Sequence, residues 1–273
     1  MNLPTFFDTH AHLDFPDFEN DLPQVMERAQ AAGIANVISI GTDFGSSKRA
    51  IALAERFPRV FAAVGWHPGH VTAAPADVRP VLRELARHSK VVAIGETGLD
   101  YYRLPSTQNA GTIEDDERYK HRQAELFRQQ LEVAAETGLN CVIHQRGDCF
   151  HDTLRLLEPF RDRVKGVFHC FAGDLEMMRR VLALGSIVSF TGIVTFKNAQ
   201  SVRNTVAAVP LGKFMLETDC PYLAPVPYRG KRCEPAHVKE ISETVANVKG
   251  CSLEELSVAT CGTAREFFPK MAV

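Results

Sequence analysis

Six residues with metal-binding side chains follow five separate apolar segments of this chain. Four are histidines and two are carboxylates, and the segments before them are rich in Val, Ile, Phe or Ala. If those segments are parallel strands of a barrel, their carboxyl ends meet on the face where barrel active sites are built. The sequence therefore predicts six metal ligands in one pocket: His10, His12, Glu96, His144, His169 and Asp219.

The pair His10 and His12 indicates how such a pocket is lined. Side chains alternate across a strand, so residues two apart point to the same face. Imidazole and carboxylate together suit zinc, manganese, nickel or iron, whereas magnesium prefers oxygen ligands. The ligand types favour a transition metal without excluding magnesium.

Six ligands are more than one four-coordinate ion needs, which predicts two divalent metal ions per chain, either Mg, Mn or Zn. A carboxylate can bridge two ions about 3.5–4 Å apart, as in phosphatases and nucleases, and Glu96 is the expected bridge. Asp219 is expected to bind one ion and to accept the proton of the attacking water. The expected catalytic residues are therefore Glu96 and Asp219.

Basic residues near these ligands could contact a phosphate. The segment Tyr-Arg-Gly-Lys-Arg at 228–232 places three cations beside an aromatic ring, and Arg229 and Lys231 are expected to hold a polyanionic backbone. On composition alone, a solvated basic turn is an equally good interpretation. His67 and Arg146 each follow a predicted strand and are weaker candidates for the same role.

Three further residues close to these segments have a structural interpretation. Trp66 is as consistent with packing at the barrel rim as with stacking on a base. Cys170 and Cys220 directly follow His169 and Asp219, but adjacent residues on a strand face opposite ways. We interpret both thiols as small buried hydrophobic side chains.

The elements that must position the ligands alternate between short apolar runs and longer stretches with helical spacing. This alternation is typical of parallel strands with crossover helices. Eight runs are expected to be strands, the number that a closed barrel requires: 5–8, 36–40, 61–64, 91–94, 141–143, 166–168, 187–190 and 214–216. Helices are expected over 20–32, 45–57, 76–88, 117–137, 151–162, 174–184, 198–207, 235–249 and 253–268. The predicted fold is an α/β protein with a single (β/α)8 TIM barrel.

The connections between these elements also follow from composition. Two long loops, 100–117 and 220–234, are expected to be functional or mobile. No linker or repeat divides the chain, so a single TIM-barrel hydrolase domain is expected over residues 1–273. Glycines follow three helices at positions where a left-handed cap is expected: Gly33, Gly138 and Gly185.

Charge and cysteine content limit the class of protein. The net charge is −2 and the sequence pI about 6.6, so there is no general attraction to nucleic acid or anionic lipid. Seven cysteines are spread singly along the chain, which predicts reduced thiols and a cytoplasmic protein. We expect no signal peptide, no membrane segment and no obligate protein partner.

At these same residues the chain resembles the TatD family of metal-dependent deoxyribonucleases, within the amidohydrolase-type barrels. The resemblance extends along nearly the whole chain, and the joint match is far more specific than a lone His-x-His pair. The matching segments, in order, are FFDTHAHLD, GWHP, IGETGLDYY, VIHQR, FHCF, LETDCPYL and YRGKRCEPAHV.

The resemblance implies hydrolysis of DNA phosphodiester bonds by a 3′→5′ exonuclease that prefers single strands and is supported by magnesium or manganese. It assigns one metal ion to His10, His12, Glu96 and Asp219, and it assigns the other ion to Glu96, His144 and His169. It also supports phosphate contact by His67 and Arg146, and substrate contact by Arg229 and Lys231.

Two features depart from the family pattern, and both concern substrate preference. Cys233 stands where the family usually has Asn, and residues 104–116 resemble an insertion with an acidic end. The principal alternative is a small-molecule hydrolase of amides, lactones or phosphoesters on the same dinuclear barrel. A non-catalytic, nucleic-acid-binding barrel is a third possibility, but the complete ligand set argues against it.

Overall fold

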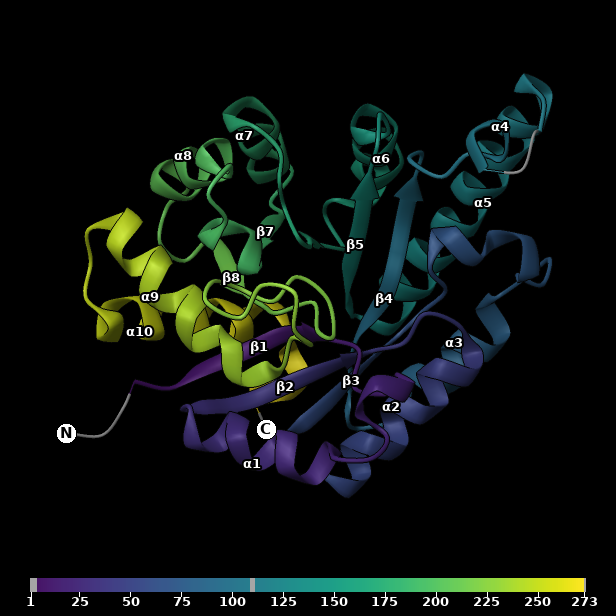
Figure 1. Ribbon diagram of the computed structural model, residues 1–273. Helices are drawn as coiled ribbons and strands as arrows, with labels where there is room; N and C mark the ends of the chain where they lie inside the picture. Colours follow the sequence, from purple (N-terminus) through teal and green to yellow (C-terminus); the bar gives the residue numbers. More distant parts are fainter. Residues whose placement is uncertain (1–3, 109–110, 273) are drawn as a thin grey trace.

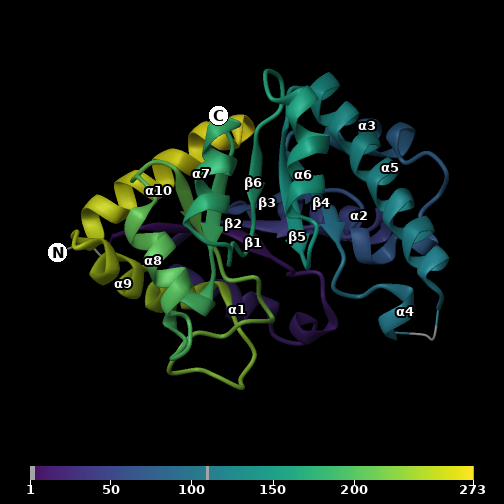
Figure 2. The same ribbon diagram turned by 90° about the horizontal axis from the view of Figure 1, so that it is seen from above.

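The computed structural model describes residues 4–108 and 111–272 of the chain. At its centre lies one sheet of eight parallel strands, in which each strand pairs with the next one along the chain. Helices alternate with the strands and lie on the outside of the sheet (Figure 1, Figure 2). The structure therefore confirms the predicted (β/α)8 fold.

All eight strands and all nine helical segments of the sequence prediction are present. The strands are β1 (Phe6–Ala11), β2 (Ile34–Ile40), β3 (Val60–Val64), β4 (Val91–Asp100), β5 (Asn140–Arg146), β6 (Gly166–Phe168), β7 (Ile187–Phe190) and β8 (Phe214–Leu216). The α-helices are α1 (Leu22–Ala31), α2 (Phe44–Arg56), α3 (Arg79–Ala86), α4 (Pro105–Gln108), α5 (Ile113–Thr137), α6 (Phe150–Leu157), α7 (Leu175–Ala183), α8 (Gln200–Ala208), α9 (Val238–Lys249) and α10 (Leu253–Phe267). Short 3-10 turns are η1 (Pro16–Phe18), η2 (Pro68–Ala73), η3 (Glu158–Phe160), η4 (Gly192–Thr195), η5 (Pro235–His237) and η6 (Pro269–Ala272). Within the described residues, no helix is long and apolar enough to cross a membrane.

The prediction was wrong about the ends of three strands. β4 reaches Asp100 and β5 reaches Arg146, because their ladder continues through the pair Gly98 and His144. β1 likewise extends to Ala11. Three predicted ligands therefore lie inside strands and not beyond them: His10, Glu96 and His144.

The long loop predicted over 100–117 is shorter and partly helical. α4 occupies part of it, and α5 begins at Ile113, earlier than predicted, because Thr112 and Asp115 form a capping box. The Thr-x-x-Asp signal was present in the sequence, but the polar composition around it favoured a loop. The predicted insertion also contains two residues outside the described part of the chain: 109 and 110.

Apolar side chains fill the barrel interior at its amino end. One cluster takes a buried residue from every strand and continues onto the end of α10, where Phe267 and Phe268 are buried. The carbonyl of Phe267 accepts a hydrogen bond from Asn140, the first residue of β5. The amino end is therefore closed, which leaves the carboxyl ends of the strands as the open face. The strand residues of this cluster include Phe7, Ile38, Ala63, Val92, Val142, Val167, Ile187 and Met215.

Glycine is required where β4 and β5 approach each other. Gly98 has a φ of 121°, and a Cβ there would lie 2.2 Å from the carbonyl oxygen of His144. A side chain at this position would therefore displace a predicted ligand.

The three predicted left-handed caps are also confirmed, with φ values of 85°, 68° and 72° at Gly33, Gly138 and Gly185.

We expect Gly98→Ala to destabilise the protein by at least about 3 kcal/mol, because a strained φ and a backbone collision act together. Gly138→Ala is the matched control, since Gly138 also has a positive φ but no atom near its missing Cβ. That variant should lose only about 1 kcal/mol. Urea unfolding followed by circular dichroism measures both free energies, and equal losses would contradict the argument.

Candidate metal centre

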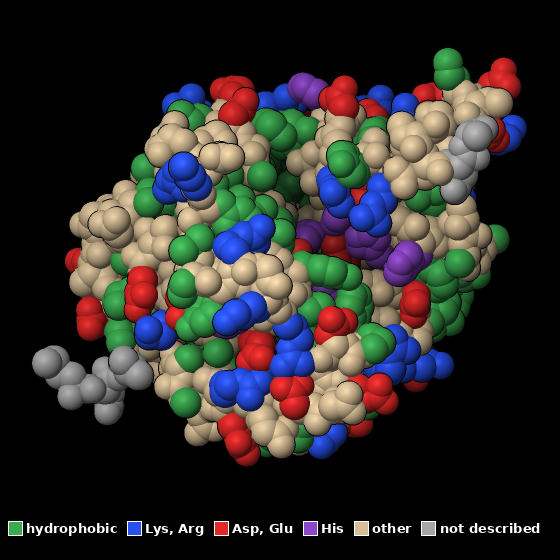
Figure 3. Space-filling model, viewed as in Figure 1, with side chains coloured by type: hydrophobic (Ala, Val, Ile, Leu, Met, Phe, Trp, Pro, Cys, Tyr) green, Lys and Arg blue, Asp and Glu red, His purple; other side chains and the backbone are tan. Residues whose placement is uncertain are grey.

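All six predicted ligands come together at the open end of the barrel. With His67 they form three overlapping groups, and the ligand atoms within each group lie within 4.8 Å of one another: His10, Glu96 and His169; His10, His12 and Asp219; and His67, Glu96 and His144. Figure 3 shows histidines gathered in a hollow of the surface, with carboxylates among them and Lys and Arg side chains on its rim. We call the six residues the histidine–carboxylate cluster: His10, His12, Glu96, His144, His169 and Asp219.

Glu96 lies at the centre of this cluster and is almost fully buried. Its Oε2 is 3.5 Å from His10 Nε2 and 3.7 Å from His12 Nε2. Its Oε1 is 2.8 Å from His144 Nδ1 and 2.8 Å from His169 Nε2. Each carboxylate oxygen thus faces a different pair of histidines, which is the geometry that a bridging ligand requires.

The first pair is completed by Asp219. Its Oδ1 lies 3.6 Å from His10 Nε2 and 3.4 Å from His12 Nε2, and the two Nε2 atoms are 3.3 Å apart. Ligand atoms bound 2.0–2.1 Å from a tetrahedral ion are about 3.3–3.4 Å apart. The spacing therefore fits a cation at their centre better than it fits direct hydrogen bonds among these atoms.

The second pair of histidines, His144 and His169, fits a cation when His144 is neutral. In the neutral ring, which is the form that binds a metal, Nε2 keeps the proton because it lies 3.2 Å from Asp100 Oδ2. Its Nδ1 then directs a lone pair toward Glu96 Oε1 and lies 3.1 Å from His169 Nε2. Facing lone pairs repel each other unless a positive partner stands between them.

The pKa shifts also show that the cluster requires positive charge. Burial alone would raise the pKa of Glu96, but the surrounding histidines hold it well below its usual value. Burial would likewise lower the pKa of His12 and His144, but neighbouring carboxylates raise both to about 9. Burial and the charge of His169 lower the pKa of His10 to about 4. Without a metal, the protonated forms of His12 and His144 supply the positive charge that keeps the buried carboxylates ionised. A divalent cation bound to the neutral rings can supply that charge instead.

Asp219 is held in place by a buried aspartate that the sequence analysis missed. Asp8 accepts hydrogen bonds from Thr218 N at 2.9 Å and from Thr218 Oγ1 at 2.6 Å. Asp219 itself has a φ of 58°, a left-handed conformation that Asp adopts more readily than most residues. Asp219 N also donates to the carbonyl of His10 at 2.9 Å. The turn after β8 is thus fixed by β1 on two sides.

Two more carboxylates contact the histidines from outside the cluster, and sequence reasoning missed both. Asp100 contacts His144, and Glu217 Oε1 lies 3.8 Å from His169 Nδ1. Glu217 also accepts a hydrogen bond from Cys170 N at 2.6 Å. Strand alternation gave no signal for them, because Glu217 lies beyond the end of β8 and the ladder of β4 shifts register between Ile94 and Thr97. Carboxylates of this kind orient metal-binding histidines.

The structure also brings His67 to the cluster. Its Nδ1 accepts a hydrogen bond from Gly69 N at 2.9 Å, and burial lowers its pKa. The neutral ring therefore carries its proton on Nε2, which lies 3.4 Å from Glu96 Oε1. His67 thus presents an N–H donor to the cluster, which suits contact with an anion better than coordination of a metal.

The structure does not bring Arg146 or Arg229 into contact with the cluster. The guanidinium of Arg146 lies 4.1 Å from the ring centroid of Tyr102. That of Arg229 lies 3.8 Å from the ring centroid of Phe196, and it donates to the carbonyl of Ala224. Both are exposed at the rim, where each cation is held over an aromatic ring.

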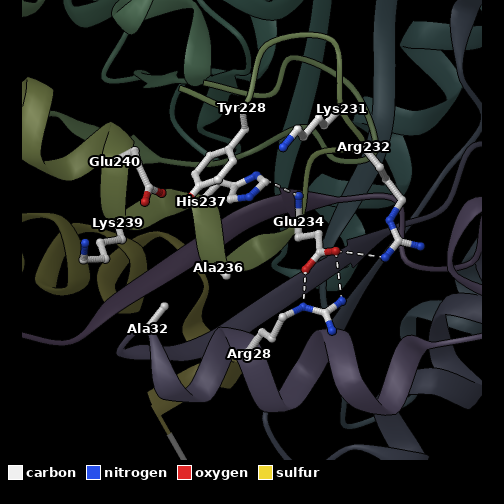
Figure 4. Close-up of a pocket in the computed structure, with 10 residues that line it drawn as sticks. All are labelled: Arg28, Ala32, Tyr228, Lys231, Arg232, Glu234, Ala236, His237, Lys239 and Glu240. Atoms are coloured by element: carbon white, nitrogen blue, oxygen red, sulfur yellow. Dashed lines mark hydrogen bonds and ion pairs between the residues drawn. The ribbon is translucent and has the colours of Figure 1, made fainter. Parts of the chain in front are cut away.

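The basic segment 228–232 contains one cation that forms ion pairs within the protein and two that face solvent. Arg232 forms ion pairs with Asp21 and Glu234, and Glu234 also binds Arg28 (Figure 4). Among the described residues, Arg229 and Lys231 have no carboxylate within ion-pair distance. Arg232 therefore anchors the segment, and its other two cations remain available to solvent. Their exposure is consistent with a solvated basic turn as well as with substrate contact.

The thiols and Trp66 have mainly structural roles. Cys220 is fully buried and Cys170 partly buried, and burial raises the pKa of both well above the usual value. Both therefore remain protonated thiols. Trp66 packs edge-on against Phe44, with its ring N–H donating to the carbonyl of His70.

Cys233 is fully buried, and its backbone N–H donates to the carbonyl of Pro221.

A (β/α)8 barrel with such a cluster at its open end defines a class, the metal-dependent hydrolases. The sequence model of the family described as TatD related DNase matches residues 7–269. The chain therefore belongs to the TatD family, as its sequence motifs predicted.

Relatives and solved structures agree with this assignment. The uncharacterized metal-dependent hydrolase YabD of Bacillus subtilis is 38% identical over 263 residues, covering 96% of this chain and 98% of the relative. A protein named 3'-5' ssDNA/RNA exonuclease TatD, from Enterobacter lignolyticus, is 33% identical over 268 residues, with coverages of 96% and 98%. The crystal structure of YJJV, a TatD homologue from Escherichia coli K12, superposes with a TM-score of 0.87 at 28% identity and covers 97% of this chain and 98% of its own.

We expect Asp100→Asn to weaken divalent-metal binding by about 10- to 100-fold, because the amide no longer accepts the His144 proton without turning away from Tyr102 N. Asp152→Asn is the matched control, since that carboxylate contacts Tyr101 and no histidine of the cluster. Calorimetric titration with Mn²⁺ measures both affinities. Thermal melting of the metal-free proteins should give the same Tm for each, and equal affinities would contradict this role.

Proposed function

We propose that this protein is a nuclease that hydrolyses DNA phosphodiester bonds from the 3′ end of single strands, using two divalent metal ions. The observation that carries this proposal is the division of the histidines between the two oxygens of Glu96. One ion would be held by His10, His12, Glu96 and Asp219. The other would be held by Glu96, His144 and His169, and Mg, Mn or Zn could occupy either position.

Divalent ions at such a site activate water and stabilise the negative charge that develops on a phosphoryl group. The protein's own residues supply the rest of the chemistry. Asp219 lies at the exposed side of the cluster and remains ionised, because hydrogen bonding and nearby histidines keep its pKa below the usual value. It can therefore accept a proton from the attacking water. Glu96 is almost fully buried and would take part in catalysis as the carboxylate that bridges the two ions.

His67 would bind a non-bridging oxygen of the scissile phosphate. Its neutral ring directs an N–H toward the cluster, and an N–H donor held by the protein stabilises charge without needing to reorganise. Arg146, Arg229 and Lys231 are exposed at the rim and would hold phosphates further along the strand. The net charge of the chain is only −2, so DNA would be attracted by these local cations and not by the overall charge.

The substrate and the direction of degradation rest on family membership. Relatives that are 33% and 32% identical carry the name 3'-5' ssDNA/RNA exonuclease, whereas others are named only as metal-dependent hydrolases. The exposed cations on the rim support a polyanionic substrate over a small neutral ester or amide.

We expect the wild type to shorten a 5′-labelled single-stranded oligonucleotide from its 3′ end in the presence of Mg²⁺ or Mn²⁺. Asp219→Asn should reduce the rate by at least about 100-fold, because it replaces an anionic ligand by a neutral amide and removes the proton acceptor. A well-folded, metal-loaded wild type that cleaves bis(p-nitrophenyl) phosphate but not DNA would favour the small-molecule hydrolase. Activity that survives in the variant would indicate a contaminating nuclease.

The double variant Arg229→Ala, Lys231→Ala should reduce DNA cleavage and its salt dependence. The slope of log(kcat/KM) against log[salt] should become shallower by about 0.7 for each phosphate contact removed from a single strand. Lys213→Ala is the control, because this exposed lysine immediately precedes β8 and lies at the closed end of the barrel. Hydrolysis of bis(p-nitrophenyl) phosphate should be unchanged in both. An unaltered salt slope in the double variant would rule out the proposed contacts.

A further inference from the structure

Exposed aromatic side chains in this protein occur only beside the cluster. The chain has 17 Phe, 5 Tyr and 1 Trp, and all of them lie within residues 4–108 and 111–272. Among these, only Tyr102 and Tyr222 have large exposed fractions, 58% and 55%. Exposed aromatic surface at a concave polar site is typical of a ligand contact.

Tyr222 lies at the end of the cluster formed by His12 and Asp219. Its backbone N–H donates to the carbonyl of Asp219 at 3.0 Å. Its ring stands edge-on to Phe15 at 6.2 Å, and the Phe15 ring stacks on His12 at 4.8 Å. A continuous aromatic path thus leads from a predicted metal ligand to the exposed ring.

Tyr102 lies at the other end of the cluster, beside His144. Its backbone N–H donates to Asp100 Oδ1 at 2.9 Å, and the second oxygen of the same carboxylate lies 3.2 Å from His144 Nε2. The Arg146 guanidinium covers one face of the ring at 4.1 Å. With that face covered and the ring more than half exposed, the other face is open to solvent.

The two rings therefore flank the cluster from opposite ends. The segment after β4, which carries Tyr102, and the segment after β8, which carries Tyr222, both lie at the open end of the barrel (Figure 2).

We propose that Tyr102 and Tyr222 are stacking platforms for the unpaired nucleobases on either side of the scissile phosphate. The proposal rests on the nuclease function and adds the residues that select single strands. Every base has a flat π-face, so stacking binds any sequence. Bases in a duplex are already stacked and paired, so they reach such platforms only after unpairing. Arg146 fixes the Tyr102 ring and places a positive charge where the adjacent phosphate would lie.

The test compares two oligonucleotides that differ only in their bases. One is a normal single strand, and the other carries tetrahydrofuran abasic residues on both sides of the 3′-terminal phosphodiester. Tyr102→Ala and Tyr222→Ala are compared with Tyr102→Phe and Tyr222→Phe, which keep the rings. Val258→Ala is the control, because Val258 is an exposed apolar residue on α10, away from the cluster.

Each Ala variant should raise KM for the normal strand by about 5- to 100-fold with little change in kcat. The wild type should discriminate against the abasic strand by a similar factor, and each Ala variant should lose part of that discrimination. The Phe variants and Val258→Ala should behave as the wild type. Metal content and Tm of each variant, measured in parallel, establish that the centre is intact.

The outcomes separate the two proposals. If the metal-loaded wild type cleaves neither strand, the nuclease function is wrong, and the stacking proposal that rests on it is wrong too. If the wild type cleaves the normal strand but the Ala variants retain its KM and its discrimination, the platforms alone are wrong. If the Phe variants are as impaired as the Ala variants, the hydroxyl acts and stacking does not, which also overturns the proposal.

Discussion

The architecture of this protein depends on one buried carboxylate that is surrounded by imidazoles. Glu96 contacts five histidines within 3.7 Å, and burying an ionised carboxylate without such partners is very costly. The histidines come from β1, β5 and the segments after β1, β3 and β6, so strands that are distant in the chain must meet here. A cation between these groups would serve the same electrostatic need. Charge compensation and metal binding are therefore the same property of the site.

The same residues close the barrel. Asp219 N donates to the carbonyl of His10, and His12 N donates to the carbonyl of Cys220, so the backbone of the predicted ligands joins the first strand to the segment after the last. Asp8 strengthens this seam through both donors of Thr218. Because the seam and the ligands share residues, distortion of one should displace the other. Apolar packing at the closed end leaves the open end free to carry polar groups.

The cations at the rim are held by contacts that differ from those in the cluster. Arg232 forms ion pairs with Asp21 and Glu234 and fixes its segment, whereas Arg229 packs over an aromatic ring and keeps its charge exposed. Ion pairs thus position the segment and leave particular cations available. Exposed loops at the open end of a barrel commonly carry substrate contacts, so the rim is where we expect substrate preference to be set.

The sequence by itself determined the alternation of strands and helices, the number of strands and the identity of the six clustered residues. Each of these follows from local pattern: apolar periodicity, and ligand-type residues after apolar runs. Strand ends were misjudged, because the ladder between β4 and β5 continues past the apolar run through long-range pairing. The supporting carboxylates Asp8, Asp100 and Glu217 were missed for a related reason. Their roles depend on which distant side chain each carboxylate contacts, and only the folded chain decides which residues meet.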